Sequence, residues 1–335
     1  MRVLVIGASG YIGSRLCELM RLQGPQWEVV AAVRRPRASL RVSRQITLEA
    51  TDPAQVAAAL ADVDAVVNCV AGDGHSIEAG ARVLFDAALA AKHKPIVVHF
   101  STMAVYGSST GLVRESDELK ADIGWYSEVK VKAELMARDF HNKGGRVVIL
   151  RPGIVYGPGS ELWIGRTGRW LRAGRLGDIG ELGDGICNLV HVDDVCAAVL
   201  ASLTRREAIG EAFNLAAPGP DTWNRFFARL AVAIGATPLQ RLSARRVRFD
   251  SKLFGPPLKI GEIVFKKLGL KVAGWPEPIP PSVFAVWQQD IVLCPDKATR
   301  LLGLRWTSDD IGVRQSAEWF VQRYPAAASG RRAAV

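Results

Sequence analysis

The sequence has few cysteines and no long apolar runs. The five cysteines are Cys17, Cys69, Cys187, Cys196 and Cys294. They are widely spaced and odd in number, without the close pairs that bind metal ions, so we expect buried free thiols, a reducing cytosol and no metal site. Because no run of about eighteen uncharged apolar residues occurs, no transmembrane helix is predicted. The first apolar run is short and breaks at Gly7, which is not expected of a signal peptide. We therefore predict a cytoplasmic protein.

Acidic residues are outnumbered, with 33 Asp and Glu against 43 Lys and Arg and a formal net charge of +10. Such a charge is compatible with nucleic acid or an anionic membrane as a partner. However, the basic residues are spread along the chain and no nucleic-acid-binding motif occurs. We favour a solubilising charge combined with an anionic cofactor, and we predict no nucleic-acid partner.

What the sequence does contain is a glycine turn directly after a short apolar run, Val3–Ile6. Strand, turn and helix start together form a dinucleotide site, in which backbone N–H groups and the helix dipole hold the pyrophosphate. Gly7 permits the chain reversal, Gly10 lets the backbone approach the phosphates, and Gly13 lets the helix lie close to the strand. The residues predicted to bind the cofactor here are Gly7, Ser9, Gly10, Tyr11, Ile12 and Gly13. A glycine-rich turn in an unrelated α/β protein is the alternative.

The first half of the chain alternates strand-like and helix-like stretches. Predicted strands are Val3–Ile6, Val29–Val33, Ala65–Cys69, Ile96–Phe100 and Arg146–Leu150, and predicted helices include Ile12–Leu22, Pro53–Leu60 and Ala79–Ala91. Strands separated by helices form right-handed βαβ units. At 335 residues, the chain is long enough for such a domain and a smaller lobe. We predict the α/β class, with a Rossmann-type doubly wound parallel sheet and a smaller, mostly C-terminal substrate lobe.

A carboxylate is missing after the second predicted strand, where NAD-binding proteins hold the ribose 2′-hydroxyl. Arg34 and Arg35 follow Val33 instead. Guanidinium groups suit a 2′-phosphate, so we predict NADP, with NAD possible. A solvated loop is the alternative interpretation of these arginines. Glu49 and Asp52 lie after the third strand region and are weaker candidates for contact with the adenine amine.

Two side chains with acid–base potential are spaced for one helix face. Tyr126 and Lys130 are four residues apart. A nearby ammonium, together with the charge of an oxidised nicotinamide, would lower the phenol pKa from about 10. The phenol could then exchange a proton with an alcohol or carbonyl oxygen while a hydride moves at the carbon, and Thr102 could hold the same oxygen. An ordinary surface Tyr and Lys is the alternative.

Five motifs occur in one order along the chain. They are the glycine turn, Ser101–Gly107 (STMAVYG), the Tyr126/Lys130 pair, Arg151–Gly159 (RPGIVYGPG) and His191–Val195 (HVDDV). Over Met1 to about Leu215, this order resembles the extended short-chain dehydrogenase/reductase superfamily, of the NAD(P)-dependent epimerase/dehydratase type.

The resemblance implies roles for individual residues. Tyr126 would be the acid/base, Lys130 would hold the ribose hydroxyls and tune Tyr126, and Thr102 would be the catalytic Ser/Thr. Ala71, Pro152 and Ile154 would lie beside the cofactor. The resemblance also implies structural roles for Asp193 and Asp194, and a homodimer.

Departures from the family pattern bear on the chemistry. Met103 and Ala104 stand where sugar dehydratases carry an Asp-Glu pair, so dehydration is not expected. Asn188 lies in the stretch where sugar-nucleotide enzymes have an arginine that grips the diphosphate, although Arg166, Arg169, Arg172 and Arg175 lie upstream. Large apolar residues are frequent after Gly159, and some could shape an apolar pocket.

We therefore expect an NAD(P)-dependent oxidoreductase that transfers hydride between nicotinamide and a secondary alcohol or ketone of a fairly apolar small-molecule substrate. The alternative is a nucleotide-sugar (UDP-sugar) epimerase with tightly bound NAD. A non-catalytic NADP sensor is a third hypothesis, although such relatives usually lose the tyrosine or the lysine.

The predicted domains are a Rossmann domain at 1–158 and 183–215, a substrate-binding lobe at 159–182 and 216–325, and a disordered tail at 326–335. Leu253–Pro281 mixes lysines with large apolar residues. It could be a flap, an ordinary packed helix or a peripheral membrane contact, of which the last is not favoured.

Overall fold

The computed structural model describes residues 1–249 and 279–325, which fall into two compact units. The first unit contains Met1–Val155, Asn188–Pro218 and Ile291–Thr307. The second contains the described residues of Tyr156–Cys187, Gly219–Asp290 and Ser308–Val335. The predicted tail and most of Leu253–Pro281 lie outside the described residues.

The first unit is built on a parallel sheet whose described strands number seven. They are β1 (Arg2–Ile6), β2 (Glu28–Val33), β3 (Arg44–Thr47), β4 (Ala65–Asn68), β5 (Ile96–Phe100), β7 (Arg146–Pro152) and β11 (Ala212–Leu215). Their order is β11-β7-β5-β4-β1-β2-β3, and every pairing is parallel. The predicted doubly wound Rossmann-type sheet is confirmed.

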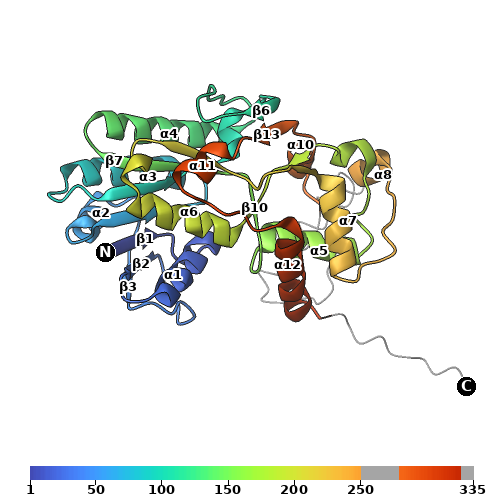
Figure 1. Cartoon of the computed structure of the whole chain (residues 1–335), viewed down its shortest axis with the longest axis horizontal. Coiled ribbons are helices and arrows are strands. Elements are labelled where there is room, and N and C mark those ends of the chain that lie inside the picture. Colours follow the sequence, from blue (N-terminus) through green and yellow to red (C-terminus); the bar gives the residue numbers. More distant parts are fainter. Residues whose placement is uncertain (250–278, 326–335) are drawn as a thin grey trace, which may run out of the picture. The chain divides into compact units, whose positions relative to one another are not determined.

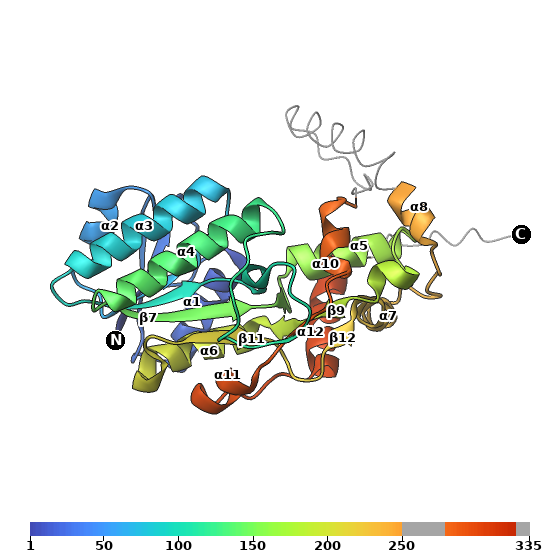
Figure 2. The same cartoon turned by 90° about the horizontal axis from the view of Figure 1, so that it is seen from above.

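Helices cover both faces of this sheet. They are α1 (Tyr11–Gln23), α2 (Pro53–Leu60), α3 (Gly74–Ala90), α4 (Trp125–Asn142), α6 (Val192–Thr204) and α11 (Asp296–Leu301). Side chains alternate along β1, so Val3 and Val5 pack against α1 and α6, whereas Leu4 and Ile6 face the core under α2, α3 and α4. Figure 2 shows α3 and α4 along one face of the sheet and α6 and α11 along the other.

The sheet's switch point lies between β1 and β4, because the chain passes from β1 to β2 and β3 on one side of β1 and then crosses to β4 on the other side. In open α/β sheets, ligands bind outside the carboxyl ends of the strands at this point. The glycine turn joins β1 to α1, which are both labelled in Figure 1. Ala71 lies shortly after β4 in the sequence. The topology therefore brings the two predicted cofactor segments to one edge.

Ile291–Thr307 lies in the first unit, whereas the sequence analysis assigned it to the substrate lobe. The short strand β13 (Ile291–Leu293) pairs with β6 (Gly111–Val113). Leu302 and Leu304 are buried in the core beside α6. Apolar burial and strand pairing thus return this late segment to the Rossmann unit, which sequence order does not reveal.

The second unit consists mainly of helices and two short strands. Its described elements are the π-helical turn η2 (Glu161–Gly165), α5 (Arg166–Arg172), η3 (Gly180–Gly183), β9 (Ile186–Cys187), β12 (Asp221–Thr222), α7 (Trp223–Ala233), α8 (Ala244–Phe249), α10 (Ser282–Trp287) and α12 (Asp309–Arg323). Trp223, Phe227 and Trp287 are buried, and the rings of Phe227 and Trp287 lie 5.3 Å apart. These aromatics form the core of the unit, so they are not available to line a pocket.

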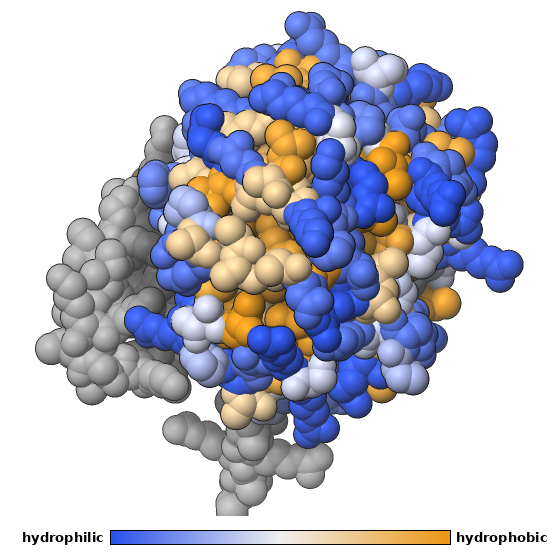
Figure 3. Space-filling view, turned by 90° about the vertical axis from the view of Figure 1, so that its left-hand side faces the viewer, coloured by the Kyte–Doolittle hydropathy of each residue, from blue (hydrophilic) through white to orange (hydrophobic). Residues whose placement is uncertain are grey.

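The surface of the first unit is mixed. On the face shown in Figure 3, apolar side chains gather near the centre and are bordered by strongly hydrophilic ones. Among the described residues, no helix has the length and apolar character needed to cross a membrane.

A partly buried ion pair joins α1 to α6. Arg15 Nε and Nη2 donate to the two carboxylate oxygens of Asp193 at 2.6 and 2.9 Å. Burial alone would raise the pKa of Asp193, but the hydrogen bond and charge of Arg15 hold it below its ordinary value. The adjacent Asp194 accepts from Thr307 Oγ1 at 2.7 Å. Both aspartates therefore hold elements of the first unit together.

Replacing Arg15 with Met should lower the free energy of unfolding by about 1 kcal/mol at pH 7, because a bidentate, charge-assisted pair is lost. The pKa of Asp193 is lowered in the folded state, so the contribution is present above the unfolded value of about 3.9 and disappears as the pH falls through the folded value. Urea unfolding at pH 7 and pH 3 measures both effects.

The matched control is Arg21→Met, on the last turn of the same helix. An equal loss for both variants, or a loss for Arg15→Met that is no smaller at pH 3 than at pH 7, would contradict the prediction.

Candidate functional site

The glycine turn has the close backbone approach that a dinucleotide requires. Gly7 has a φ of +81°, and a Cβ atom there would lie 2.8 Å from the carbonyl oxygen of Cys69. A Cβ atom at Gly13 would lie 2.5 Å from the oxygen of Gly7. Gly10 is the N-cap of α1, whose first turn has neither a side-chain cap nor an acidic residue. A positive helix end therefore faces the turn and suits an anion.

The arginines predicted to select the cofactor are exposed. Arg34 and Arg35 follow the end of β2 directly. Arg34 acts electrostatically on the Asp73 carboxylate, which caps α3 by accepting from Ser76 N at 2.8 Å. Both guanidinium groups can meet an anion from solvent.

The two acids considered for the adenine differ in their surroundings. Glu49 is exposed and accepts from Thr51 Oγ1 at 3.1 Å. Asp52 instead caps α2, accepting from the backbone N–H groups of Ala54 and Gln55 at 2.9 and 3.1 Å. The structure therefore gives Asp52 a helix-capping role.

The three predicted catalytic residues lie where β5 meets the start of α4. Thr102 follows β5, and its hydroxyl favours a lower pKa of the Tyr126 phenol through a hydrogen bond. Tyr126 and Lys130 both lie on α4, and Lys130 Nζ donates to the backbone oxygen of Phe100 at 2.9 Å. Tyr126 is 40% exposed as a whole residue, whereas Lys130 is buried.

Burial sets the pKa values of this pair. Desolvation raises the pKa of Tyr126, and the hydrogen bond from Thr102 opposes this shift only in part. Desolvation also lowers the pKa of Lys130 to about 8. The sequence analysis expected a lowered phenol pKa, with help from a nicotinamide charge. In the protein without a cofactor, the pKa of the Tyr126 phenol is raised, because desolvation outweighs a single hydrogen bond.

A buried polar network next to these residues was missed at the sequence level. Glu134 accepts from Ser101 Oγ at 2.6 Å and forms an ion pair with Arg151, and both charged side chains are fully buried. Arg151 Nη1 also donates to Tyr106 Oη at 2.6 Å. The available signals were the position of Glu134, four residues after Lys130, and an arginine at the end of an apolar strand.

The stretch predicted to lie beside the nicotinamide is held against a neighbouring segment. Pro152 ends β7 and Ile154 begins β8 (Ile154–Tyr156), where its N–H donates to Asn188 O at 2.7 Å. The Asn188 amide is used inside the protein, because Nδ2 donates to Ile291 O at 2.8 Å and Oδ1 accepts from Leu293 N at 2.9 Å. Asn188 therefore anchors β13.

The upstream arginines have partners within the second unit. Arg169 pairs with Glu161 at 2.6 Å, and Arg172 donates to the backbone oxygen of Tyr324. The guanidinium of Arg166 lies 5.9 Å from the centre of the Trp170 ring. These contacts give the three arginines structural roles.

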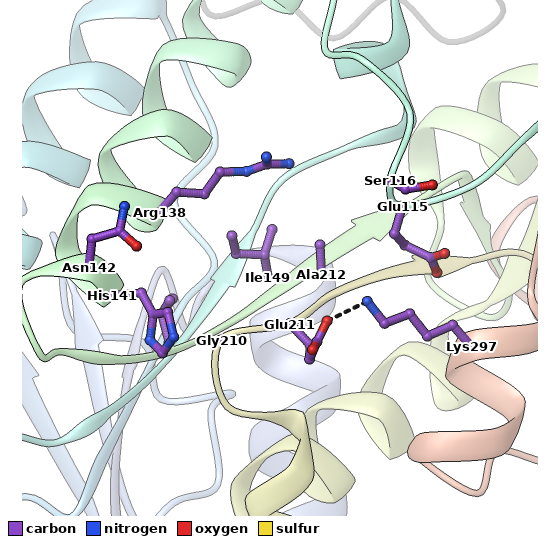
Figure 4. Close-up of a pocket in the computed structure, with 11 residues that line it drawn as sticks. Glu115, Ser116, Arg138, His141, Asn142, Ile149, Gly210, Glu211, Ala212 and Lys297 are labelled. Carbon is purple, nitrogen blue, oxygen red and sulfur yellow. Dashed lines mark hydrogen bonds and ion pairs between the residues drawn. The ribbon is translucent and has the colours of Figure 1, made fainter.

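A separate cavity of about 440 Å³ lies beside the C-terminal end of α4 and the start of β11. Figure 4 shows the residues that line it. Arg138, His141 and Lys297 line it together with Glu115 and Glu211. Lys297 Nζ forms an ion pair with Glu211 at 2.5 Å across one wall. None of the predicted site residues lines this cavity.

Comparisons with known proteins show the family and the fold of this chain. Residues 3–216 match the family described as NAD dependent epimerase/dehydratase. The 2-alkyl-3-oxoalkanoate reductase of Stenotrophomonas maltophilia is 26% identical over 259 residues, covering 70% of this chain and 76% of that protein. A 3-diazoavenalumate denitrifying reductase from a Streptomyces species is 28% identical over 264 residues, covering 73% and 85%.

Solved structures share the fold. The UDP-glucose 4-epimerase of Thermotoga maritima superposes with a TM-score of 0.72 at 19% identity, covering 96% of this chain and 99% of that one. The glycine turn, the β5 end with Thr102 and the helix with Tyr126 and Lys130 occupy one sheet edge, and the family match spans most of the first unit. The chain therefore belongs to the NAD-dependent epimerase/dehydratase family.

Proposed function

We propose that this protein is an NADP-preferring oxidoreductase that interconverts a ketone and a secondary alcohol in a fairly apolar substrate. The observation that carries this proposal is the hydrogen bond from Lys130 Nζ to the Phe100 carbonyl, which holds the helix that bears Tyr126 against the end of β5, where Thr102 follows. Such a site can donate a proton to a carbonyl oxygen. The bound dinucleotide would supply the hydride.

Tyr126, Thr102 and Lys130 have separate roles in the proposed reaction. In reduction, Tyr126 gives its phenolic proton to the carbonyl oxygen, and the Thr102 hydroxyl holds the same oxygen in place. Desolvation of the hydroxyl raises the pKa of Tyr126, which favours the protonated phenol that reduction needs. Lys130, drawn to the strand end by the Phe100 carbonyl, holds the ribose of the cofactor.

One observation argues against sugar dehydration, and a second argues against a sugar-nucleotide substrate. Met103 and Ala104 carry no proton that could assist loss of water from a sugar. The Asn188 amide is bonded to the backbone of β13, so it has little capacity left for a substrate diphosphate. The similarity to a 2-alkyl-3-oxoalkanoate reductase supports an oxo group on an alkyl chain.

Wild-type protein should consume NADPH, followed by absorbance at 340 nm, with at least one member of a panel of alkyl and 3-oxoalkanoate ketones. Tyr126→Phe should lower kcat by about 10² to 10⁴-fold, because it removes the proton donor. Tyr324→Phe, at a tyrosine of the second unit, is the control and should retain activity.

The proposal fails if no ketone is reduced while UDP-sugars are epimerised and the purified protein carries stoichiometric NAD. That result would establish the epimerase alternative. If Tyr126→Phe leaves every activity unchanged, the role of its phenol is wrong.

Cofactor preference is tested at the end of β2. Arg34→Ala should raise KM for NADPH about tenfold and leave KM for NADH unchanged, because a charge-assisted contact with the 2′-phosphate is lost. Arg37→Ala, three residues later in the same loop, is the matched control. Equal changes for both cofactors would contradict a 2′-phosphate contact.

A further inference from the structure

The end of β5 is joined to α4 by three successive contacts. The Phe100 carbonyl accepts from Lys130 Nζ at 2.9 Å, and Ser101 Oγ donates to Glu134 Oε2 at 2.6 Å. Thr102 is the next residue, and its hydroxyl favours a lower pKa of the Tyr126 phenol through a hydrogen bond. The three partners on α4 are four residues apart and share one helix face. The end of β5 therefore contacts one face of α4 at Lys130 and also one turn before it, at Tyr126, and one turn after it, at Glu134.

The segment that begins at Thr102 is also held at its far end. Thr102 caps the short 3-10 helix η1 (Met103–Tyr106) by accepting from Ala104 N at 3.3 Å. The Tyr106 hydroxyl accepts from Arg151 Nη1 at 2.6 Å and donates to Asn214 Oδ1 at 2.7 Å. Arg151 in turn pairs with Glu134. One buried ion pair thus holds Ser101 through its carboxylate and Tyr106 through its guanidinium.

The hydrogen-bonding groups of Glu134 and Arg151 are occupied by neighbouring residues. Glu134 accepts from Ser101, from Arg151 and, at 2.9 Å, from Arg138 Nη2. Arg151 also donates to Glu115 O at 3.1 Å from the nitrogen that contacts Tyr106. A buried ion pair with its hydrogen bonds so satisfied fixes its neighbours in one geometry.

We propose that the Glu134–Arg151 ion pair is a positioning device for catalysis, which sets the Thr102 hydroxyl against the Tyr126 phenol by clamping both ends of Ser101–Tyr106. This inference rests on the proposed function of Thr102 and Tyr126. Glu134 and Arg151 act through Ser101 and Tyr106 and contact no reacting atom.

The test uses variants at the ends of the clamp, because removing either charge would leave the other buried and unpaired and could prevent folding. Ser101→Ala and Tyr106→Phe each remove one hydroxyl and leave the ion pair in place. Each should lower kcat about 10- to 100-fold, because a displaced catalytic group loses alignment, while KM for the dinucleotide stays within about twofold of wild type.

The matched control is Ser202→Ala. Ser202 is fully buried in the first unit, and its Oγ donates to Ala198 O at 2.7 Å on α6, so the chemical change and the burial are the same. Thermal unfolding of all variants measures their stability. If Ser101→Ala and Ser202→Ala give the same kcat, or if KM for the dinucleotide changes as much as kcat, the positioning role is refuted.

A readout without turnover separates this inference from the proposed function. The ionisation of Tyr126 is followed by ultraviolet titration, taking the difference between each protein and the same protein with Tyr126→Phe. The hydrogen bond from Thr102 lowers the pKa of this phenol, and Lys130 is the charged group one turn along α4. Ser101→Ala should therefore raise the titration midpoint, whereas Ser202→Ala should not. An unchanged midpoint refutes the inference even if wild-type protein reduces no ketone.

Discussion

The buried ion pair between Glu134 and Arg151 is the interaction on which the catalytic end of the first unit depends. A buried carboxylate or guanidinium is costly unless its charge and hydrogen-bonding groups are all used, and breaking such a pair costs about 3–5 kcal/mol. Here Ser101 and Tyr106 complete the bonding of the pair. The pair thereby joins α4, β7 and the segment after β5, and these elements present the residues of the proposed reaction.

The glycine turn obeys a different constraint, which is space. Gly7 and Gly13 lie so close to neighbouring backbone that a Cβ atom at either position would overlap a carbonyl oxygen. The helix end at Gly10 carries no acid, so it remains suited to a phosphate. The proposed cofactor site therefore depends on the absence of side chains, whereas the proposed catalytic site depends on side chains that are held by hydrogen bonds to one another.

Proteins with this fold catalyse several kinds of reaction, and particular residues narrow the range of reactions expected of this chain. The same architecture occurs in a UDP-glucose 4-epimerase, so the sheet does not choose between epimerase and reductase. Asn188 shows how context decides a role. In the sequence it stands where relatives carry a diphosphate-binding arginine, and in the structure its amide anchors β13. Function must be argued from such contacts.

The sequence by itself determined the parallel sheet, the glycine turn and the shared helix face of Tyr126 and Lys130, because these follow from local periodicity and short spacing. Only the tertiary structure decided that Ile291–Thr307 returns to the Rossmann unit, that Asp52 caps α2, and that Glu134 meets Arg151. The first and last of these contacts join segments that are distant in the sequence, and the capping role of Asp52 depends on the exact residue at which α2 begins. Burial, which sets the pKa values of Tyr126 and Lys130, likewise arises only when the helix packs on the sheet.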